Sequence, residues 1–209
     1  MKKQLCKIFS LWCILSVVMC LSSCVDNDIN PYPSLKTDLV DVETNASGVL
    51  SKLRLDNGET YDVSSQGVKF NVADTLLRCL ASYAMEESGL KLYSISNIFS
   101  HKPVPLATFL EDGEYTEETL PRDPVNVVSM WKSGGYINMQ LGVLTTGNVS
   151  HAYAFCDEGE GHYSLLHRKP LNISESYTET VFLSMPIPEG VESLTFSVTT
   201  YDGTYTRTF

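Results

Sequence analysis

The chain has 209 residues, of which 43% are hydrophobic, 10% aromatic and 19% charged. A chain of this length and composition can bury a core and forms one domain or two small ones. Acidic residues outnumber basic ones by 25 to 15, which gives a formal net charge of -10. Because nucleic-acid binding needs a basic stripe that neutralises phosphates, this balance argues against a nucleic-acid partner.

The first 23 residues have the pattern of an export signal. Lys2 and Lys3 give the start of the chain a positive charge, and residues 8–21 then contain no ionisable side chain except cysteine. This stretch of about 15 residues is short for a membrane-spanning helix, which needs roughly 20. We therefore predict a signal peptide over residues 1–23.

Residues 21–24, Leu-Ser-Ser-Cys, resemble the bacterial lipobox, in which small residues precede a cysteine that accepts diacylglycerol. Three other cysteines precede Cys24, but only Cys24 follows a leucine and two small residues and is itself followed by polar sequence. We predict cleavage before Cys24 and lipidation of its thiol, with two or three acyl chains that anchor the protein stably to membrane lipid. The expected location is the outer membrane, at the cell surface or facing the periplasm.

The next two segments predict a tether and a small β-barrel. Residues 24–36 are polar and contain two prolines, which is typical of a tether. Residues 37–109 contain short alternating patterns, and Asp56-Asn57-Gly58 favours a hairpin turn between two of them. Strands are expected at 38–43, 49–55, 59–63, 78–85 and 90–99, with a helical turn at 72–76. This order favours an OB-like small barrel.

The rest of the chain predicts a second β domain. Residues 110–124 are acidic and bounded by prolines, so we expect an interdomain linker. Regular strand spacing without a long helix then favours a β-sandwich over residues 125–209. Seven strands are expected, at 125–132, 136–144, 151–156, 162–167, 177–185, 193–201 and 204–209. The predicted fold class is therefore all-β, an OB-like barrel followed by an immunoglobulin-like β-sandwich, although Trp131 lacks the cysteine pair of true immunoglobulin domains.

Several of these features together resemble the NigD-like lipoproteins of Bacteroidetes. They are the lipobox, the tether, and an OB-like module that ends in Ser100-His101-Lys102-Pro103-Val104-Pro105. Asp123-Pro124-Val125, Trp131 and Gly135-Tyr136-Ile137-Asn138 follow. Leu55-Asp56-Asn57-Gly58 and the strand at 78–83 agree with the family pattern, whereas Cys79 and the long acidic segment depart from it. The resemblance implies an N-terminal OB domain, a C-terminal β-sandwich and an envelope lipoprotein, with bacteriocin immunity as a suggested role.

The sequence contains none of the common catalytic motifs: no GxSxG elbow, P-loop, HExxH or EF-hand loop. His162 and His167 are five residues apart, so on one strand they face opposite sides and cannot bind one metal together. Residues 156–162 gather a thiol, carboxylates and an imidazole, but such an acidic hairpin loop is typically solvated. We predict no catalytic residue, no metal site and no cofactor. A periplasmic hydrolase that uses the His162 region is the alternative.

The remaining candidate residues point to binding and modification. Asp74-Thr75-Leu76 resembles the short O-glycosylation signal of secreted Bacteroidetes proteins, which makes Thr75 a candidate site. Cys79 and Cys156 are expected to be free thiols in separate domains. Four aromatic residues could form a carbohydrate platform, although core or rim packing is the commoner role: Trp131, Tyr136, Tyr153 and Tyr163. The leading hypothesis is a non-catalytic envelope lipoprotein that binds an unknown protein or glycan partner, and a structural accessory subunit of an envelope assembly is a further alternative.

Overall fold

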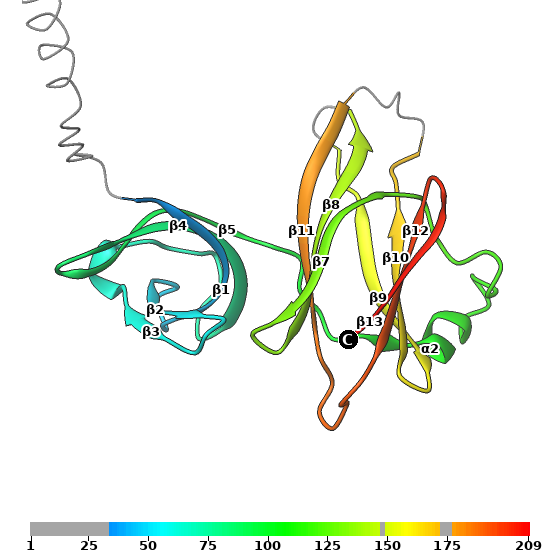
Figure 1. The fold of residues 1–209 in the computed structure, drawn as a ribbon, viewed down its shortest axis with the longest axis horizontal. Helices are drawn as coiled ribbons and strands as arrows, with labels where there is room; N and C mark the ends of the chain where they lie inside the picture. Colours follow the sequence, from blue (N-terminus) through cyan, green and yellow to red (C-terminus); the bar gives the residue numbers. More distant parts are fainter. Residues whose placement is uncertain (1–33, 147–148, 172–176) are drawn as a thin grey trace, which may run out of the picture. The chain divides into compact units, whose positions relative to one another are not determined.

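The computed structural model describes residues 34–146, 149–171 and 177–209. The predicted signal peptide, Cys24 and most of the predicted tether lie outside these residues. From Ser34 onward the chain forms one compact unit, built almost entirely of β-strands (Figure 1). The all-β prediction is confirmed. No helix among the described residues is both long enough and apolar enough to span a membrane.

The N-terminal sheet curls into an OB-like barrel, as predicted (Figure 1). Its antiparallel strands stand in the order β3-β2-β1-β4-β5. The side-chain amide of Gln66 donates to Leu90 O and accepts from Leu92 N, both at 2.8 Å, so it bridges the short helix after β3 to β5. The elements are β1 (Lys36–Thr44), β2 (Leu50–Leu55), β3 (Thr60–Asp62), the 3-10 helix η1 (Ser64–Gln66), β4 (Leu76–Glu86) and β5 (Gly89–Asn97).

The helical turn predicted at 72–76 is wrong, because the helical turn of the barrel is η1. Asp74 has a φ of 50°, which a right-handed helix does not accommodate. The main chain of Thr44 instead donates to Thr75 O at 3.0 Å. The apolar spacing of 72–76 therefore reflects the entry into β4 and not a helix.

Both faces of β1 are buried, for different reasons. Val40 and Val42 point into the barrel and are fully buried, in a core shared with β2 and β4. Leu39 and Asp41 alternate with them and are only 6% and 4% exposed. Because successive side chains of a strand point to opposite faces, these two belong to the outer face of the barrel. Something outside the barrel must therefore cover them.

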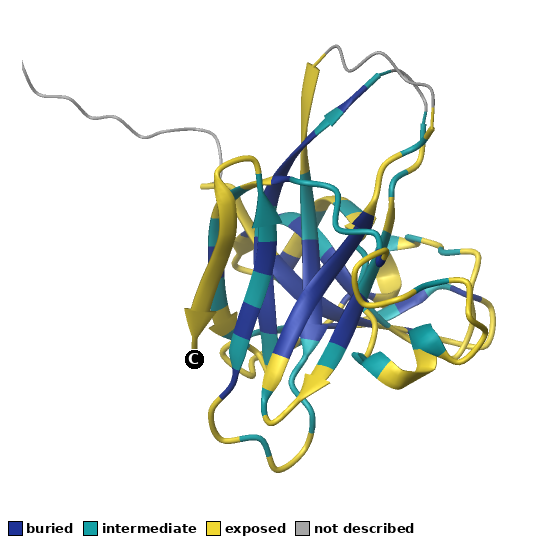
Figure 2. Ribbon diagram, turned by 90° about the vertical axis from the view of Figure 1, so that its right-hand side faces the viewer, coloured by how far each residue is buried: buried dark blue, intermediate teal, exposed yellow. Residues whose placement is uncertain are grey.

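The C-terminal half forms a sandwich of two sheets, and all seven predicted strands are present. One sheet has the order β11-β8-β7 and the other has the order β13-β12-β10-β9-β6. Their strands are β6 (Val104–Pro105), β7 (Asn126–Ser133), β8 (Tyr136–Thr145), β9 (Ala152–Gly159), β10 (His162–Arg168), β11 (Tyr177–Pro186), β12 (Thr195–Thr200) and β13 (Gly203–Thr208). Buried residues line the middle of these strands, whereas β13 is exposed (Figure 2).

The sandwich core is assembled from the inner faces of both sheets. Met139 and Leu141 of β8 pack with Leu183 of β11, and Phe155 and Phe196 come from the other sheet. The two phenylalanine rings meet edge to face, with centroids 6.1 Å apart. Aromatic pairs favour this geometry beyond simple burial of their area. The core therefore lies between the two sheets, which leaves the outer face of β11-β8-β7 available for other contacts.

The segment predicted as a linker, residues 110–124, follows the one α-helix of the described chain, α2 (Leu106–Leu110). Leu120 is 5% exposed and packs with Cys156 and Leu166. The main chain of His167 donates to Pro121 O at 2.9 Å. The end of this segment is thus held against the sandwich, and the domain boundaries that we drew from the sequence remain a prediction.

Candidate binding site

A buried arginine links the barrel to the sandwich. Arg78 of β4 is 3% exposed. Its guanidinium donates to both carboxylate oxygens of Asp56, at 2.6 and 2.9 Å, and to Asp41 Oδ1 at 3.2 Å. It also donates to Asn138 Oδ1 at 3.1 Å and, through Nε, to Ser184 Oγ at 3.4 Å, both in the sandwich. Buried charges require such pairing, so these five residues, here the Arg78 cluster, join the two modules.

Two further side chains, Tyr136 and Ser133, complete the surroundings of the Arg78 cluster. The guanidinium carbon of Arg78 lies 4.2 Å from the centre of the Tyr136 ring. Ser133 Oγ donates to Asp56 Oδ2 at 2.5 Å. Burial raises the pKa of Tyr136 to about 12, and the nearby carboxylate of Asp41 adds to the shift. The phenol therefore stays protonated at neutral pH and places a polarisable ring, not a charge, over the arginine.

Four of the residues that carry the family resemblance meet in or beside this cluster. Asp56 belongs to Leu55-Asp56-Asn57-Gly58, and Arg78 begins the strand segment 78–83. Tyr136 and Asn138 belong to the third motif, on β8. These four residues take part in the contact between the two modules. This part of the family pattern therefore specifies how the two modules pack.

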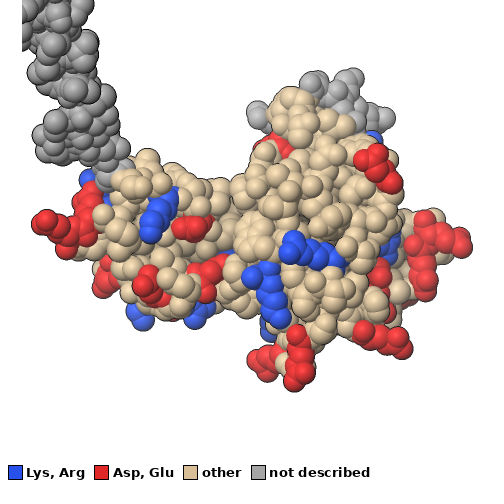
Figure 3. Space-filling view, in the orientation of Figure 1, with Lys and Arg blue, Asp and Glu red and all other residues tan. Residues whose placement is uncertain are grey.

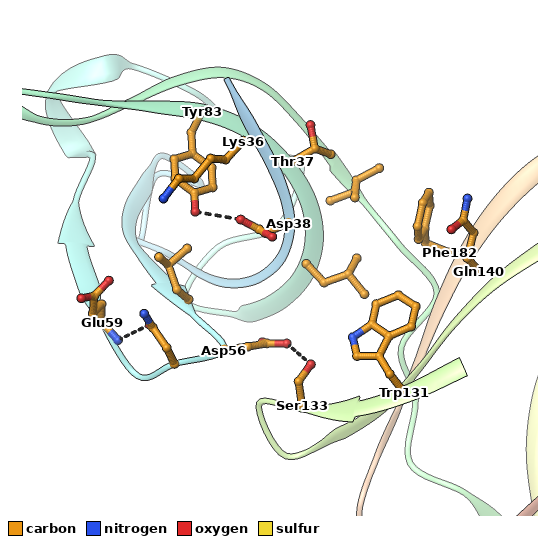
Figure 4. Close-up of a pocket in the computed structure, with 14 residues that line it drawn as sticks. Lys36, Thr37, Asp38, Asp56, Glu59, Tyr83, Trp131, Ser133, Gln140 and Phe182 are labelled. Atoms are coloured by element: carbon orange, nitrogen blue, oxygen red, sulfur yellow. Dashed lines mark hydrogen bonds between the residues drawn. The ribbon is translucent and has the colours of Figure 1, made fainter. Parts of the chain in front are cut away.

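A groove of about 590 Å³ lies beside the Arg78 cluster (Figure 4). Its barrel wall comes from β1, β4 and the turn between β2 and β3, and its sandwich wall comes from β7, β8 and β11. The volume falls in the range of small-molecule sites, which is about 300–1,000 Å³. The lining residues are Lys36, Thr37, Asp38, Leu39, Leu55, Asp56, Asn57, Glu59, Leu80, Tyr83, Trp131, Ser133, Gln140 and Phe182.

Several polar groups of the groove are already occupied, and others are free. Tyr83 donates its hydroxyl to Asp38 Oδ2 at 2.8 Å, and Asn57 Oδ1 accepts from the main chain of Glu59 at 3.0 Å. Within the described part of the chain, the side-chain amide of Gln140 has no hydrogen-bond partner. The same holds for the indole N–H of Trp131. The groove therefore presents unused donors and acceptors next to aromatic surface.

Of the four aromatic candidates, only Trp131 lines this groove. Tyr163 is 4% exposed and belongs to the sandwich core, so a role in a surface platform is excluded for it. Tyr153 packs against the ring of His167, with centroids 5.2 Å apart. Tyr136 covers Arg78. The packing role that we expected to be commoner is therefore confirmed for Tyr163, whereas Tyr136 and Tyr153 pack on neighbouring side chains and also line two other pockets.

The four histidines differ in burial and in their contacts. His162 is exposed and His167 is buried, on opposite faces of β10, as their spacing predicted. His167 Nδ1 donates to Asp123 O at 2.9 Å, and its Nε2 lies 2.9 Å from His151 Nδ1. Burial lowers the pKa of His167 below its ordinary value, so the ring is neutral at pH 7. His101 packs on the Phe99 ring at 4.8 Å.

The hydrolase alternative finds no nucleophile paired with a histidine among the described residues. Ser164 is fully buried, and its Oγ donates to Glu158 Oε1 at 2.6 Å and accepts from Arg122 at 3.2 Å. Burial raises the pKa of the Cys156 thiol to about 11, so it is not a thiolate at neutral pH. The described residues also hold no group of three or more His, Cys, Asp or Glu side chains placed to bind a metal ion.

The two modification candidates differ in how far the structure describes them. Cys24 lies outside the described residues. Thr75 is exposed just before β4, and its hydroxyl donates to Ala73 O at 2.8 Å.

Cys79 and Cys156 are free and buried in different clusters, as expected. Cys79, a departure from the family pattern, fills a position in the barrel core.

Comparison with known proteins shows the fold of this chain. No protein-family model matches it, and no curated protein matches it. A NigD-like immunity protein from Bacteroides caccae is similar in structure, with a TM-score of 0.63 and 24% identity, over 84% of this chain and 93% of that one. The resemblance stated from the sequence is therefore confirmed at the level of the fold.

Two further solved structures share the arrangement. A protein from Parabacteroides distasonis described as toxin related matches with a TM-score of 0.63 and 18% identity, over 84% of this chain and 92% of that one. A DUF1344 protein of unknown function from Bacteroides vulgatus matches with a TM-score of 0.60 and 15% identity, over 84% of this chain and 90% of that one. None of these descriptions denotes an enzyme.

Proposed function

We propose that this protein is a non-catalytic, lipid-anchored envelope protein that binds a protein or glycan partner in the groove between barrel and sandwich. The groove carries the proposal, because Trp131 and the unpaired amide of Gln140 line it while the neighbouring Arg78 cluster holds its two walls together. A pre-formed site loses less conformational entropy on binding than a flexible one. The immunity-like and toxin-related descriptions of two structural neighbours support a role in protection against a bacteriocin.

The surface charge supports a partner other than nucleic acid. Acidic side chains are spread over both barrel and sandwich on the face shown in Figure 3, in a chain of formal net charge -10. Phosphate backbones are bound by continuous basic surfaces that release counterions. We therefore propose a protein or a glycan, and not a nucleic acid, as the partner.

Photo-crosslinking tests the groove as the binding site. A benzophenone amino acid at Asn57, which is exposed in the groove, is expected to form a discrete adduct in living cells that express the full chain. The same group at Asp202, exposed in the β12–β13 turn, is the matched control. The adduct at position 57 is expected to disappear with Trp131→Ala. Equal adducts at both positions, or adducts insensitive to Trp131→Ala, would count against the groove.

Mass spectrometry of the adduct separates the two kinds of partner. An exported bacteriocin-like polypeptide would support the immunity-like role. An envelope polysaccharide would support glycan binding. An adduct with a cytoplasmic protein only would contradict the proposed location.

Replacement of Cys24 by serine tests the anchor. Because the thiol is the one acyl acceptor that we propose, Cys24→Ser is expected to move the protein from the membrane fraction to the soluble or uncleaved pool. Detergent partitioning followed by immunoblotting measures this, with Cys20→Ser as the control that should still partition with the membrane. Unchanged partitioning of Cys24→Ser would refute the lipoprotein assignment. Protease digestion of intact cells then distinguishes a surface from a periplasmic location.

A further inference from the structure

The outer face of the sheet β11-β8-β7 presents its side chains in rows across the three strands. One row consists of Trp131, Asn138 and Ser184, which stand opposite one another in the register. The next row towards the end of β8 consists of Ser129, Gln140 and Phe182. Asn138 and Ser184 are bound to Arg78, whereas Trp131, Gln140 and Phe182 line the groove. One part of this face therefore contacts the barrel, and the neighbouring part forms a wall of the groove.

The free part of this face combines aromatic surface with an unused amide. Phe182 stands opposite Gln140 on β11, Trp131 lies one row away on β7, and all three are half-buried. Two strand spacings of about 4.8 Å and an offset of two residues place the backbones of Trp131 and Phe182 roughly 12 Å apart. Figure 4 shows Trp131, Gln140 and Phe182 together on the sandwich side of the groove. A flat ligand with polar edges fits such a wall, since its face can cover a ring while its edge reaches the amide.

The barrel wall offers hydrogen-bonding groups of the same kind. Asp38 Oδ2 is held by the hydroxyl of Tyr83, and the other oxygen of Asp38 has no partner among the described residues. Asn57 is already engaged in the turn, since its oxygen accepts from the main chain of Glu59 and its side chain also bonds the Glu59 carboxylate. Planar amides and carboxylates of this type bind pairs of neighbouring hydroxyls, because each supplies two polar atoms.

The charges of the groove disfavour a strongly charged ligand. Asp56 is neutralised by Arg78 at 2.6 Å, and Glu59 accepts from the hydroxyl of Tyr61 at 3.1 Å. Lys36 is the one basic residue of the lining, beside three acidic residues, so an anionic ligand meets net repulsion. With Asp56 paired to Arg78, the charges of Asp38 and Glu59 are offset in part by Lys36, so the excess negative charge that a basic peptide would meet is small. The groups that remain free are mostly uncharged donors, acceptors and aromatic faces.

We infer that the groove binds an uncharged saccharide, with one sugar face on Trp131 and its hydroxyls bonded to Gln140 and Asp38. This rests on the proposed function and names the ligand class of the same groove. The apolar C–H face of a sugar ring covers the indole, and the hydroxyls at its edge replace the water that those polar groups bind in the free protein. No covalent step is involved.

Tryptophan fluorescence measures this binding directly, because Trp131 is the one tryptophan after residue 33. The protein from residue 34 onward, which contains both cores, is titrated with maltohexaose, mannohexaose and N-acetylchitohexaose. Hexagalacturonate is the anionic comparison. At least one neutral hexasaccharide is expected to change the emission saturably, and hexagalacturonate is not. No response to any neutral hexasaccharide, or tighter binding of the anionic one, would overturn the saccharide assignment.

Two variants locate the saccharide in the groove. Gln140→Ala is expected to weaken binding about fivefold to tenfold, which corresponds to one lost hydrogen bond. Asn71→Ala, at an exposed position outside the groove lining, is the control and should bind like the parent protein. Thermal unfolding of both confirms that they are folded. Equal affinity of Gln140→Ala and parent would place the sugar elsewhere, whereas a protein adduct at position 57 with silent sugars would reject the saccharide and keep the groove as the binding site.

Discussion

Replacement of Arg78 by methionine is expected to lower the free energy of unfolding by about 3–5 kcal/mol. Methionine fills a comparable volume but leaves the carboxylates of Asp41 and Asp56 without their shared partner. Asp41 is 4% exposed, so water cannot replace the lost bonds. Asn138 and Ser184 lose the donor that ties the sandwich to the barrel. Removal of one member of a buried charged group costs more than the group itself contributes, because the others remain desolvated.

Arg54→Met is the matched control for this prediction. Arg54 also donates to Asp41, at 2.7 Å, but its side chain is 52% exposed and Asp41 keeps Arg78. Exposed ion pairs contribute no more than about 1 kcal/mol, so this change should cost little. Urea denaturation followed by circular dichroism measures both variants. Similar losses for Arg78→Met and Arg54→Met would show that the Arg78 cluster does not stabilise the junction.

Most strands could be predicted from the sequence because the β pattern is local. Alternation along 136–144 matches β8 within one residue at its end, since its inner face carries Ile137, Met139 and Leu141. Asp56-Asn57-Gly58 was identified as a turn, and Gly58 has a φ of 92°. Each of these signals lies within a few residues of the structure that it specifies.

Other parts of the fold depend on contacts that no local pattern contains. β6 has two residues and forms by parallel pairing with β9, more than 50 positions later in the chain. β10 and β12 pair in parallel, although β11 separates them in the chain and belongs to the other sheet. The helical turn was misplaced because Val72 and Leu76 have helix-like spacing, whereas their conformation is set by contacts with Thr44 and Asn45.

Only one residue of the binding groove, Trp131, was among the binding candidates predicted from the sequence. The three tyrosines of that prediction lie outside this groove. Gln140 and Phe182 were missed, since a polar and an aromatic residue at outward positions of two strands look like ordinary surface. Gln140 and Phe182 stand opposite each other because of the register between β8 and β11. This register cannot be read from the sequence.

A substitution at Gly134 is expected to cause the other large loss of stability, because a side chain there would collide with Asp56, a member of the Arg78 cluster. Gly134 has a φ of 60°, and a Cβ built there would overlap the carboxylate of Asp56. Asp56 cannot move away without losing its two bonds to Arg78. Gly134→Ala should therefore cost about 3 kcal/mol, from backbone strain together with a disturbed buried ion pair.

Gly135→Ala separates the collision from the backbone strain. Gly135 has a φ of 85°, and a Cβ there has no atom within 4 Å. It should therefore show only the strain, about 1–3 kcal/mol for a residue forced into this region. In the Arg78→Met background Asp56 keeps only its bond to Ser133 and can move more easily, so Gly134→Ala should cost less there than in the parent protein, while the cost of Gly135→Ala stays the same. A double-mutant cycle by urea denaturation measures this coupling. Additive costs of Gly134→Ala and Arg78→Met would mean that Asp56 does not couple the β7–β8 turn to Arg78 of the barrel.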